Sequence, residues 1–231
     1  MFSPRTAGPP PRDVPRLALR SWAASIAQST LVLILLFCAP GAPAVASDTG
    51  LSGGEGHPRE RFPLALWAPP LRDARLDAAL KRAIDDWNTV FRETLGRAAF
   101  ARARGPEAAQ VALAVEAVTS PGLMGETYVQ TDGAGVIALP VRIAIFEPAA
   151  RGQTSRETLL YQIAAHELGH ALGLAHARDP RSLMCCIPGS VDFGDPVARE
   201  AYVEARRHPD VGSARAQLAE HYRRFWGGAD R

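Results

Sequence analysis

The sequence predicts an α+β domain, close to the α/β type, built around one mixed sheet. Short apolar runs with strand character alternate with longer stretches of helical periodicity, and this order favours packed layers of strands and helices. The chain has 231 residues, of which 47% are hydrophobic and 22% are charged. It is therefore long enough to bury one sizeable core, and no internal repeat indicates another architecture.

The N-terminus has the anatomy of an export signal. Four arginines precede a mostly apolar stretch at residues 22–39, and Ala44-Val45-Ala46 offers the small residues that a signal peptidase requires. We therefore expect residues 1–46 to be a signal peptide cleaved after Ala46. The protein would then be secreted, periplasmic or located in the cell envelope, without stable membrane association. The alternative is an uncleaved N-terminal membrane anchor.

The charge balance provides no basis for binding nucleic acid. Residues 1–46 contain four arginines and one aspartate, so the rest of the chain has 22 basic and 23 acidic residues and a formal charge of −1. Nucleic-acid-binding domains usually carry a clustered positive charge. We therefore expect no nucleic-acid partner.

The first half of the expected domain begins with a flexible, glycine-rich lead-in at residues 47–61. A short strand is expected at residues 62–67, before Pro69 and Pro70. Residues 71–95 then have the pattern of an amphipathic helix that ends at Gly96. Its apolar face comprises Leu76, Leu80, Ile84, Trp87 and Phe91. An arginine- and alanine-rich connector should follow, up to Gly105-Pro106.

Further strands are expected at residues 111–118, 127–130, 136–139 and 141–146. Asp132-Gly133 is a hairpin signal between two of them. Pro140 separates the last two strands, and a proline there is typical of an edge strand because it cannot donate a hydrogen bond to the ladder.

The second half of the domain should be mainly helical. Residues 155–174 are expected to form a helix with Thr154 or Ser155 as its N-cap. An irregular segment rich in proline and glycine follows, and two C-terminal helices are expected at residues 197–207 and 213–226. Residues 62–231 are thus predicted to be one domain, with its C-terminal helices within about 196–226.

Three histidines at residues 166–176, in the sequence HELGHALGLAH, point to a metal site. His166 and His170 are four residues apart, so a helix places them on one face, where both can direct a ring nitrogen to one ion. Gly173 can adopt the backbone angles of a sharp bend, which would return the chain so that His176 supplies a third ligand. Three imidazoles leave a fourth position for water, which is typical of catalytic zinc.

Glu167 is the candidate catalytic residue. It follows the first ligand directly, so its side chain is rotated by about 100° around the helix and should flank the ion without ligating it. From there a carboxylate can take a proton from water and pass it to a leaving amine.

This motif resembles the extended zinc motif HExxHxxGxxH of the metzincin clan of metallopeptidases. Met184, eight residues after His176, is similar to the methionine turn of that clan, and residues 177–184 look like its matrixin (peptidase M10-type) branch. The resemblance implies a metzincin fold, with a twisted five-stranded sheet, a long helix and an active-site zinc helix. It also implies a zinc-dependent endopeptidase, with Gly173 and Met184 as supports for the site.

The same resemblance implies that a peptide substrate binds as an added strand along a sheet edge. The expected substrate-binding residues are Gly135, Val136, Ile137, Ala138 and Leu139. The implied cofactor is one Zn²⁺ ion; the acidic loops that hold Ca²⁺ in this family are thin here, so the sequence does not support structural calcium. The expected partner is a protein or peptide, and a monomer is the default.

Two adjacent cysteines remain after the expected cleavage, Cys185 and Cys186. We expect free thiols, because neighbouring cysteines can join only through a strained ring. Two other functions stay open: a zinc-stabilised binding domain without turnover, and a zinc hydrolase that acts on a non-peptide amide. The intact Glu167 argues against the first, and substrate profiling would separate the second.

Overall fold

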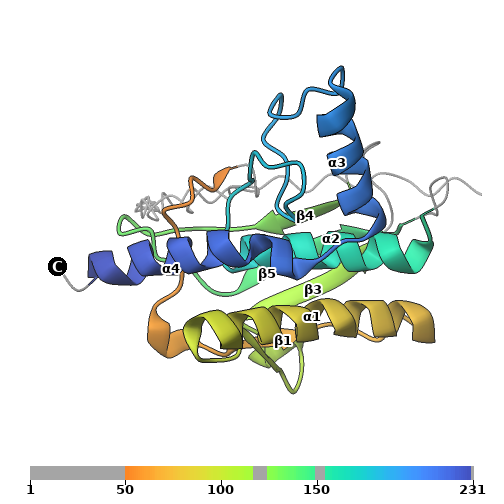
Figure 1. Cartoon of the computed structure of the whole chain (residues 1–231). Coiled ribbons are helices and arrows are strands. Elements are labelled where there is room, and N and C mark those ends of the chain that lie inside the picture. The colour runs from red at the N-terminus through yellow and green to blue at the C-terminus, as the bar shows by residue number, and fades with distance from the viewer. Residues whose placement is uncertain (1–49, 117–123, 149–153, 230–231) are drawn as a thin grey trace, which may run out of the picture. The chain divides into compact units, whose positions relative to one another are not determined.

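The computed structural model describes residues 50–116, 124–148 and 154–229. The expected signal peptide lies outside these residues, as does the end of the strand predicted at 111–118. The described residues form five strands and four α-helices, joined by loops and short 3₁₀ helices (Figure 1). None of the helices in this described part of the chain is long and apolar enough to cross a membrane.

One mixed sheet carries the fold, with the strand order β2-β1-β3-β5-β4. Its strands are β1 (Leu64–Trp67), β2 (Phe100–Arg102), β3 (Val111–Glu116), β4 (Gly125–Tyr128) and β5 (Val141–Phe146). Strands β2, β1, β3 and β5 run parallel, whereas β4 lies antiparallel to β5 at the edge of the sheet. The predicted α+β class and the mixed five-stranded sheet are therefore confirmed.

Two expectations about the strands are wrong. Residues 97–106 are not only a connector, because Phe100 is buried and begins β2, which pairs with β1. Strand β5 is not an edge strand, because it pairs with β3 on one side and β4 on the other. Pro140 directly precedes β5 rather than lying within it, so its missing N–H group costs the ladder no hydrogen bond.

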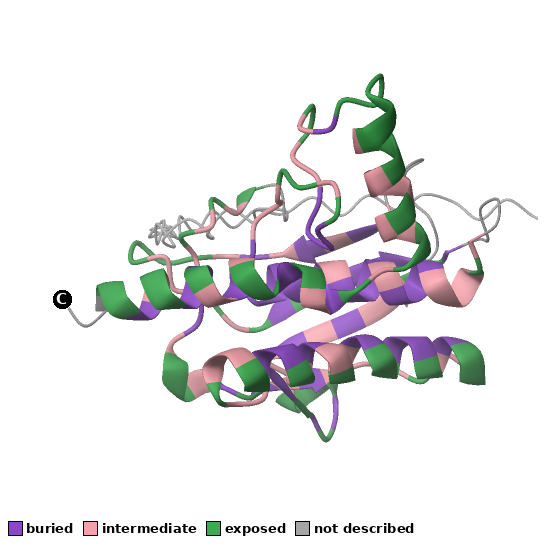
Figure 2. Ribbon diagram, in the orientation of Figure 1, coloured by how far each residue is buried: buried purple, intermediate pink, exposed green. Residues whose placement is uncertain are grey.

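Helices α1 (Ala74–Leu95) and α2 (Arg156–Ala171) pack against each other and lie in front of the sheet in Figure 1. Helix α1 ends at Gly96, which has a φ of 75°, and most of its predicted apolar face is buried (Figure 2). The Trp87 indole donates a 2.7 Å hydrogen bond to the carbonyl oxygen of Ala165. Helix α2 is thus joined to α1 by a buried hydrogen bond as well as by apolar packing.

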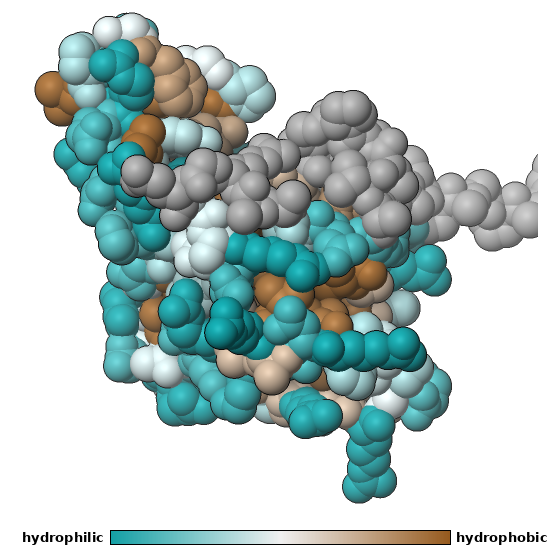
Figure 3. All heavy atoms as spheres, turned by 90° about the vertical axis from the view of Figure 1, so that its right-hand side faces the viewer, coloured by the Kyte–Doolittle hydropathy of each residue, from teal (hydrophilic) through white to brown (hydrophobic). Residues whose placement is uncertain are grey.

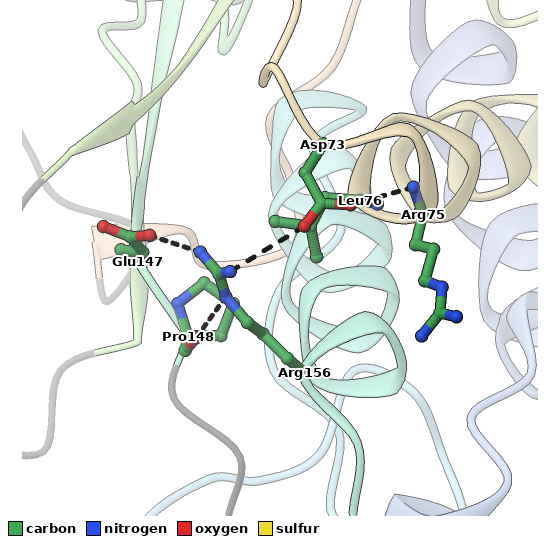
Figure 4. A network of polar contacts seen from close by, with 6 residues as sticks. All are labelled: Asp73, Arg75, Leu76, Glu147, Pro148 and Arg156. Atoms are coloured by element: carbon green, nitrogen blue, oxygen red, sulfur yellow. Dashed lines mark hydrogen bonds and ion pairs between the residues drawn. The ribbon is translucent and has the colours of Figure 1, made fainter.

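A polar network ties the beginnings of both helices to the end of β5 (Figure 4). The Arg156 guanidinium pairs with Glu147 and lies 3.9 Å from Asp73, and its Nε donates to the carbonyl of Pro148 over 3.0 Å. Asp73 also caps α1, accepting from the backbone N–H groups of Arg75 and Leu76. Figure 3 shows this side of the molecule, with apolar surface in its middle bordered by hydrophilic side chains.

Helices α3 (Pro196–Arg207) and α4 (Arg215–Ala229) follow the predicted bounds closely but differ in burial. Helix α3 has no buried residue, whereas parts of α4 are buried (Figure 2). The buried residues of α4 include Leu218, Tyr222 and Trp226, which belong to the hydrophobic core. Residues 50–61, expected to be a flexible lead-in, pack in this region, and the Trp226 indole donates a 2.9 Å hydrogen bond to the His57 carbonyl.

Candidate metal centre

Helix α2 carries two of the three candidate ligands in its last two turns. Its N-cap is Ser155, whose hydroxyl accepts from the backbone N–H of Thr158 over 3.1 Å, and Glu157 lies in the first turn where a negative charge stabilises the helix. His166 is partly exposed, and His170 is fully buried.

A Schellman motif ends α2 and turns the chain back. The N–H of Leu174 donates to the Gly169 carbonyl over 3.0 Å, and the N–H of Gly173 donates to the His170 carbonyl over 2.8 Å. Gly173 has a φ of 88°, in the left-handed region that favours glycine. A β-carbon there would also overlap the carbonyl oxygen of Glu55. Glycine is therefore required at the predicted bend, both for its backbone angles and for space.

Side chains from distant segments satisfy the carbonyl groups that the end of α2 leaves free. His57 donates from Nε2 to the Ala171 carbonyl over 2.9 Å, since a carbonyl oxygen can only accept. The Tyr222 hydroxyl donates to the Leu172 carbonyl over 2.8 Å. The lead-in and α4 thus clamp the bend, and both His57 and His221 are buried there.

The bend brings the three histidines together at one point. The Nε2 atom of His166 lies 3.0 Å from that of His170 and 3.2 Å from that of His176. Ligand atoms of a tetrahedral zinc ion at about 2.0–2.1 Å would be about 3.3 Å apart. The observed spacing therefore fits a zinc ion that all three rings share.

Hydrogen bonds at the Nδ1 atoms of His166 and His170 place the ring proton on Nδ1, as metal binding through Nε2 requires. Nδ1 of His166 lies 2.9 Å from the Leu183 carbonyl, and Nδ1 of His170 lies 2.7 Å from the Leu174 carbonyl. Both Nδ1 atoms must donate, which leaves the lone pairs on Nε2. Burial, and secondarily the proximity of His170, lowers the pKa of His166 to about 3. Burial and then His176 lower the pKa of His170 to about 3, so both rings are neutral near pH 7.

Met184 packs directly against helix α2. Its side chain is fully buried, and a β-carbon on Gly169 would overlap its sulfur. The N–H of Ala177 donates to the Met184 carbonyl over 2.8 Å, which links the segment after His176 to the methionine turn. Met184 therefore packs against the turn of α2 between the two ligands.

Glu167 faces the sheet edge next to the histidines. Its side chain is 3% exposed, and its Oε2 accepts a 2.7 Å hydrogen bond from the Thr127 hydroxyl on β4. The sequence does not single out Thr127, because the contact joins segments 40 residues apart. Only the prediction of a strand near 127–130 pointed to this region.

The segment Gly135–Leu139 is not a strand of the sheet, contrary to expectation. Val136 and Ile137 form only isolated bridges, and the N–H groups of Ile137 and Ala138 already donate to Gly56 and Gln130. Asp132 closes a turn with Gly135, as the hairpin signal predicted. The strand at the sheet edge beside Glu167 is β4 instead.

Cys185 and Cys186, expected as free thiols, form a disulfide directly after Met184. The Arg206 guanidinium on α3 donates to the Cys185 carbonyl over 3.0 Å and to the Ser182 carbonyl over 3.4 Å. Helix α3 is thus joined to the methionine turn, and no cysteine thiol of the described residues takes part in the histidine cluster.

Comparisons with known proteins agree with this geometry. The family model described as matrixin, Peptidase M10, matches residues 62–192, which is more than half of the chain. Over 73 residues the chain is 34% identical to the macrophage metalloelastase of Oryctolagus cuniculus. That alignment covers 32% of this chain and 12% of the elastase, so the chain spans only a small part of that relative.

Proposed function

Because the chain belongs to the matrixin family, we propose that it is an exported zinc-dependent endopeptidase whose general base is Glu167. The observation that carries this proposal is the convergence of three Nε2 atoms, from His166, His170 and His176, at the spacing of zinc ligands. Two of these rings have their Nδ1 protons directed to backbone carbonyls, so the lone pairs point inward.

The three histidines hold one Zn²⁺ ion in this proposal. Zinc supplies a Lewis acid that polarises the scissile carbonyl and lowers the pKa of water. The partial exposure of His166 and His176 provides the open side through which substrate and water reach the site. A carboxylate oxygen of Glu167 takes a proton from the attacking water and then passes it to the leaving amine.

The substrate binds as an extended strand along β4. This strand lies at the end of the sheet, and alternate residues of an edge strand direct their N–H and C=O groups away from the neighbouring strand. Strand β4 therefore takes the role first expected for Gly135–Leu139. Thr127 of the same strand contacts Glu167, so an added strand would run close to the base.

Glu167→Ala is the variant that tests the base. The purified protein should keep its zinc but lose hydrolysis of an unfolded protein such as casein. Glu157→Gln, at the start of the same helix, serves as the control and should leave turnover unchanged. Undiminished hydrolysis by Glu167→Ala would rule out the assigned base.

The wild-type protein separates the peptidase from the other two functions. Zinc-loaded protein that cleaves no member of a broad peptide library would favour a binding domain. Turnover of small amides without any cleavage of peptides would favour a non-peptide hydrolase. For export, the N-terminal sequence of the protein recovered outside the cytoplasm should begin at Ser47.

A further inference from the structure

We propose that Thr127 and Gly125 of β4 are positioning residues that hold the Glu167 carboxylate in its working orientation. This inference rests on the proposed function, because it assigns a partner to the proposed base. The Thr127 hydroxyl lies 2.7 Å from Oε2 of Glu167 and 3.0 Å from the main-chain carbonyl oxygen of the same residue. Thr127 is fully buried and Glu167 is 3% exposed, so little water competes for this contact.

Gly125 provides the room for the other carboxylate oxygen. It lies two residues before Thr127, so both positions face the same side of the strand. A β-carbon on Gly125 would lie 2.7 Å from Oε1 of Glu167 and 2.8 Å from Cγ2 of Ile163. Gly125 has no positive φ, so the glycine is required for space and not for its backbone angles.

Through these two contacts, β4 would position both the substrate and the base. The outer edge of the strand would align the substrate backbone, and the strand face that carries Gly125 and Thr127 contacts the carboxylate of Glu167, the base that acts on the attacking water. Positioning of this kind contributes to the rate because it removes the freedom of the reacting groups before the reaction. Loss of the Thr127 hydroxyl should therefore lower kcat and leave substrate affinity nearly unchanged.

A purely structural role is the competing explanation. The Thr127 hydroxyl could merely join β4 to α2 through the main-chain carbonyl of Glu167. Thr94 provides a matched control, because its hydroxyl donates a 2.6 Å hydrogen bond to the helix carbonyl of Val90 on α1. Thr94→Val removes a similar bond away from the histidines.

The experiment compares Thr127→Val, which removes the hydroxyl, with Thr127→Ser, which keeps it. General-base catalysis contributes about 10²–10⁴-fold, so partial misplacement of the base in Thr127→Val should lower kcat by roughly 10-fold. KM for a fluorogenic peptide and the zinc content should match those of the wild type. Thr127→Ser should recover most of the lost kcat, and Thr94→Val should lose none.

A crystal structure of Thr127→Val gives a readout that is independent of activity. It should show the Glu167 carboxylate turned away from β4. Gly125→Ala should displace the same group by steric overlap and lower kcat as well, which keeps the test available if Thr127→Val does not fold.

The inference is overturned if Thr127→Val has the wild-type kcat, if Ser and Val lose equal activity, or if the carboxylate does not move. Each of these results can be obtained while Glu167→Ala is inactive. Failure of the positioning role is therefore distinguishable from failure of the proposed peptidase.

Discussion

The bend that delivers the third histidine depends on Gly173, and Gly173→Ala should damage both folding and metal binding. Alanine at a φ of 88° costs about 1–2 kcal/mol, because its β-carbon crowds the backbone in the left-handed region. The same β-carbon would overlap the Glu55 carbonyl oxygen, which belongs to the backbone and cannot rotate away. Overpacking of this kind costs about 1–3 kcal/mol. We expect a total destabilisation of about 2–5 kcal/mol.

Gly96→Ala is the matched control for this substitution. Gly96 has a similar φ of 75°, but a β-carbon there would have no atom within 4 Å. It should therefore show the conformational cost of about 1–2 kcal/mol and no overlap. The difference between the two variants isolates the contacts that a β-carbon at position 173 would make with Glu55 and His221.

Two measurements check the prediction. Urea unfolding with a chelator present gives the free energies of unfolding without the contribution of zinc. Competition with a chromophoric chelator gives the zinc affinity, which Gly173→Ala should weaken by roughly 10–100-fold, as misplaced supporting contacts do at metal sites. The reasoning fails if Gly173→Ala and Gly96→Ala are equally stable and bind zinc equally well.

Two further predictions concern the clamp at the end of α2. Burial is the main cause that lowers the pKa of His57 to about 4, from 6.5 in the unfolded chain. As the pH falls from 6.5 to 4, the unfolded state therefore binds a proton that the folded state does not, and the folded state loses stability. His57→Gln, which keeps a donor for the Ala171 carbonyl, should therefore lose less stability than the wild type between pH 6.5 and 4. The difference should reach about 3 kcal/mol in thermal unfolding, and an equal loss in both proteins would contradict the assignment to His57. Tyr222→Phe removes the hydroxyl that donates to the Leu172 carbonyl and should cost about 1–2 kcal/mol in urea unfolding; a loss near zero would show that the clamp contributes nothing.

The clustering of the three histidines could be predicted from the sequence because its geometry is local. Two histidines four residues apart on a helix must share one face. A bend at Gly173 then turns the chain back, so that His176 can approach that same face. The helices were predictable for the same reason, since the apolar stripe of α1 and the glycine that ends it are both local patterns.

The parts that could not be predicted depend on contacts between distant segments. Strand β2 is only three residues long, and its pairing with β1 decides its conformation more than its composition does. His57 precedes the sheet but is buried by α4. The partner of Glu167 could not be inferred either, because Thr127 reaches it only after β4 pairs with β5.

The most direct test of the central claim is a crystal structure of the zinc-loaded protein with data collected at the zinc absorption edge. We predict a single anomalous peak at about 2.0–2.1 Å from each of the three Nε2 atoms of His166, His170 and His176. The absence of a peak between these rings, or a peak held by other residues, would contradict the assignment of the site.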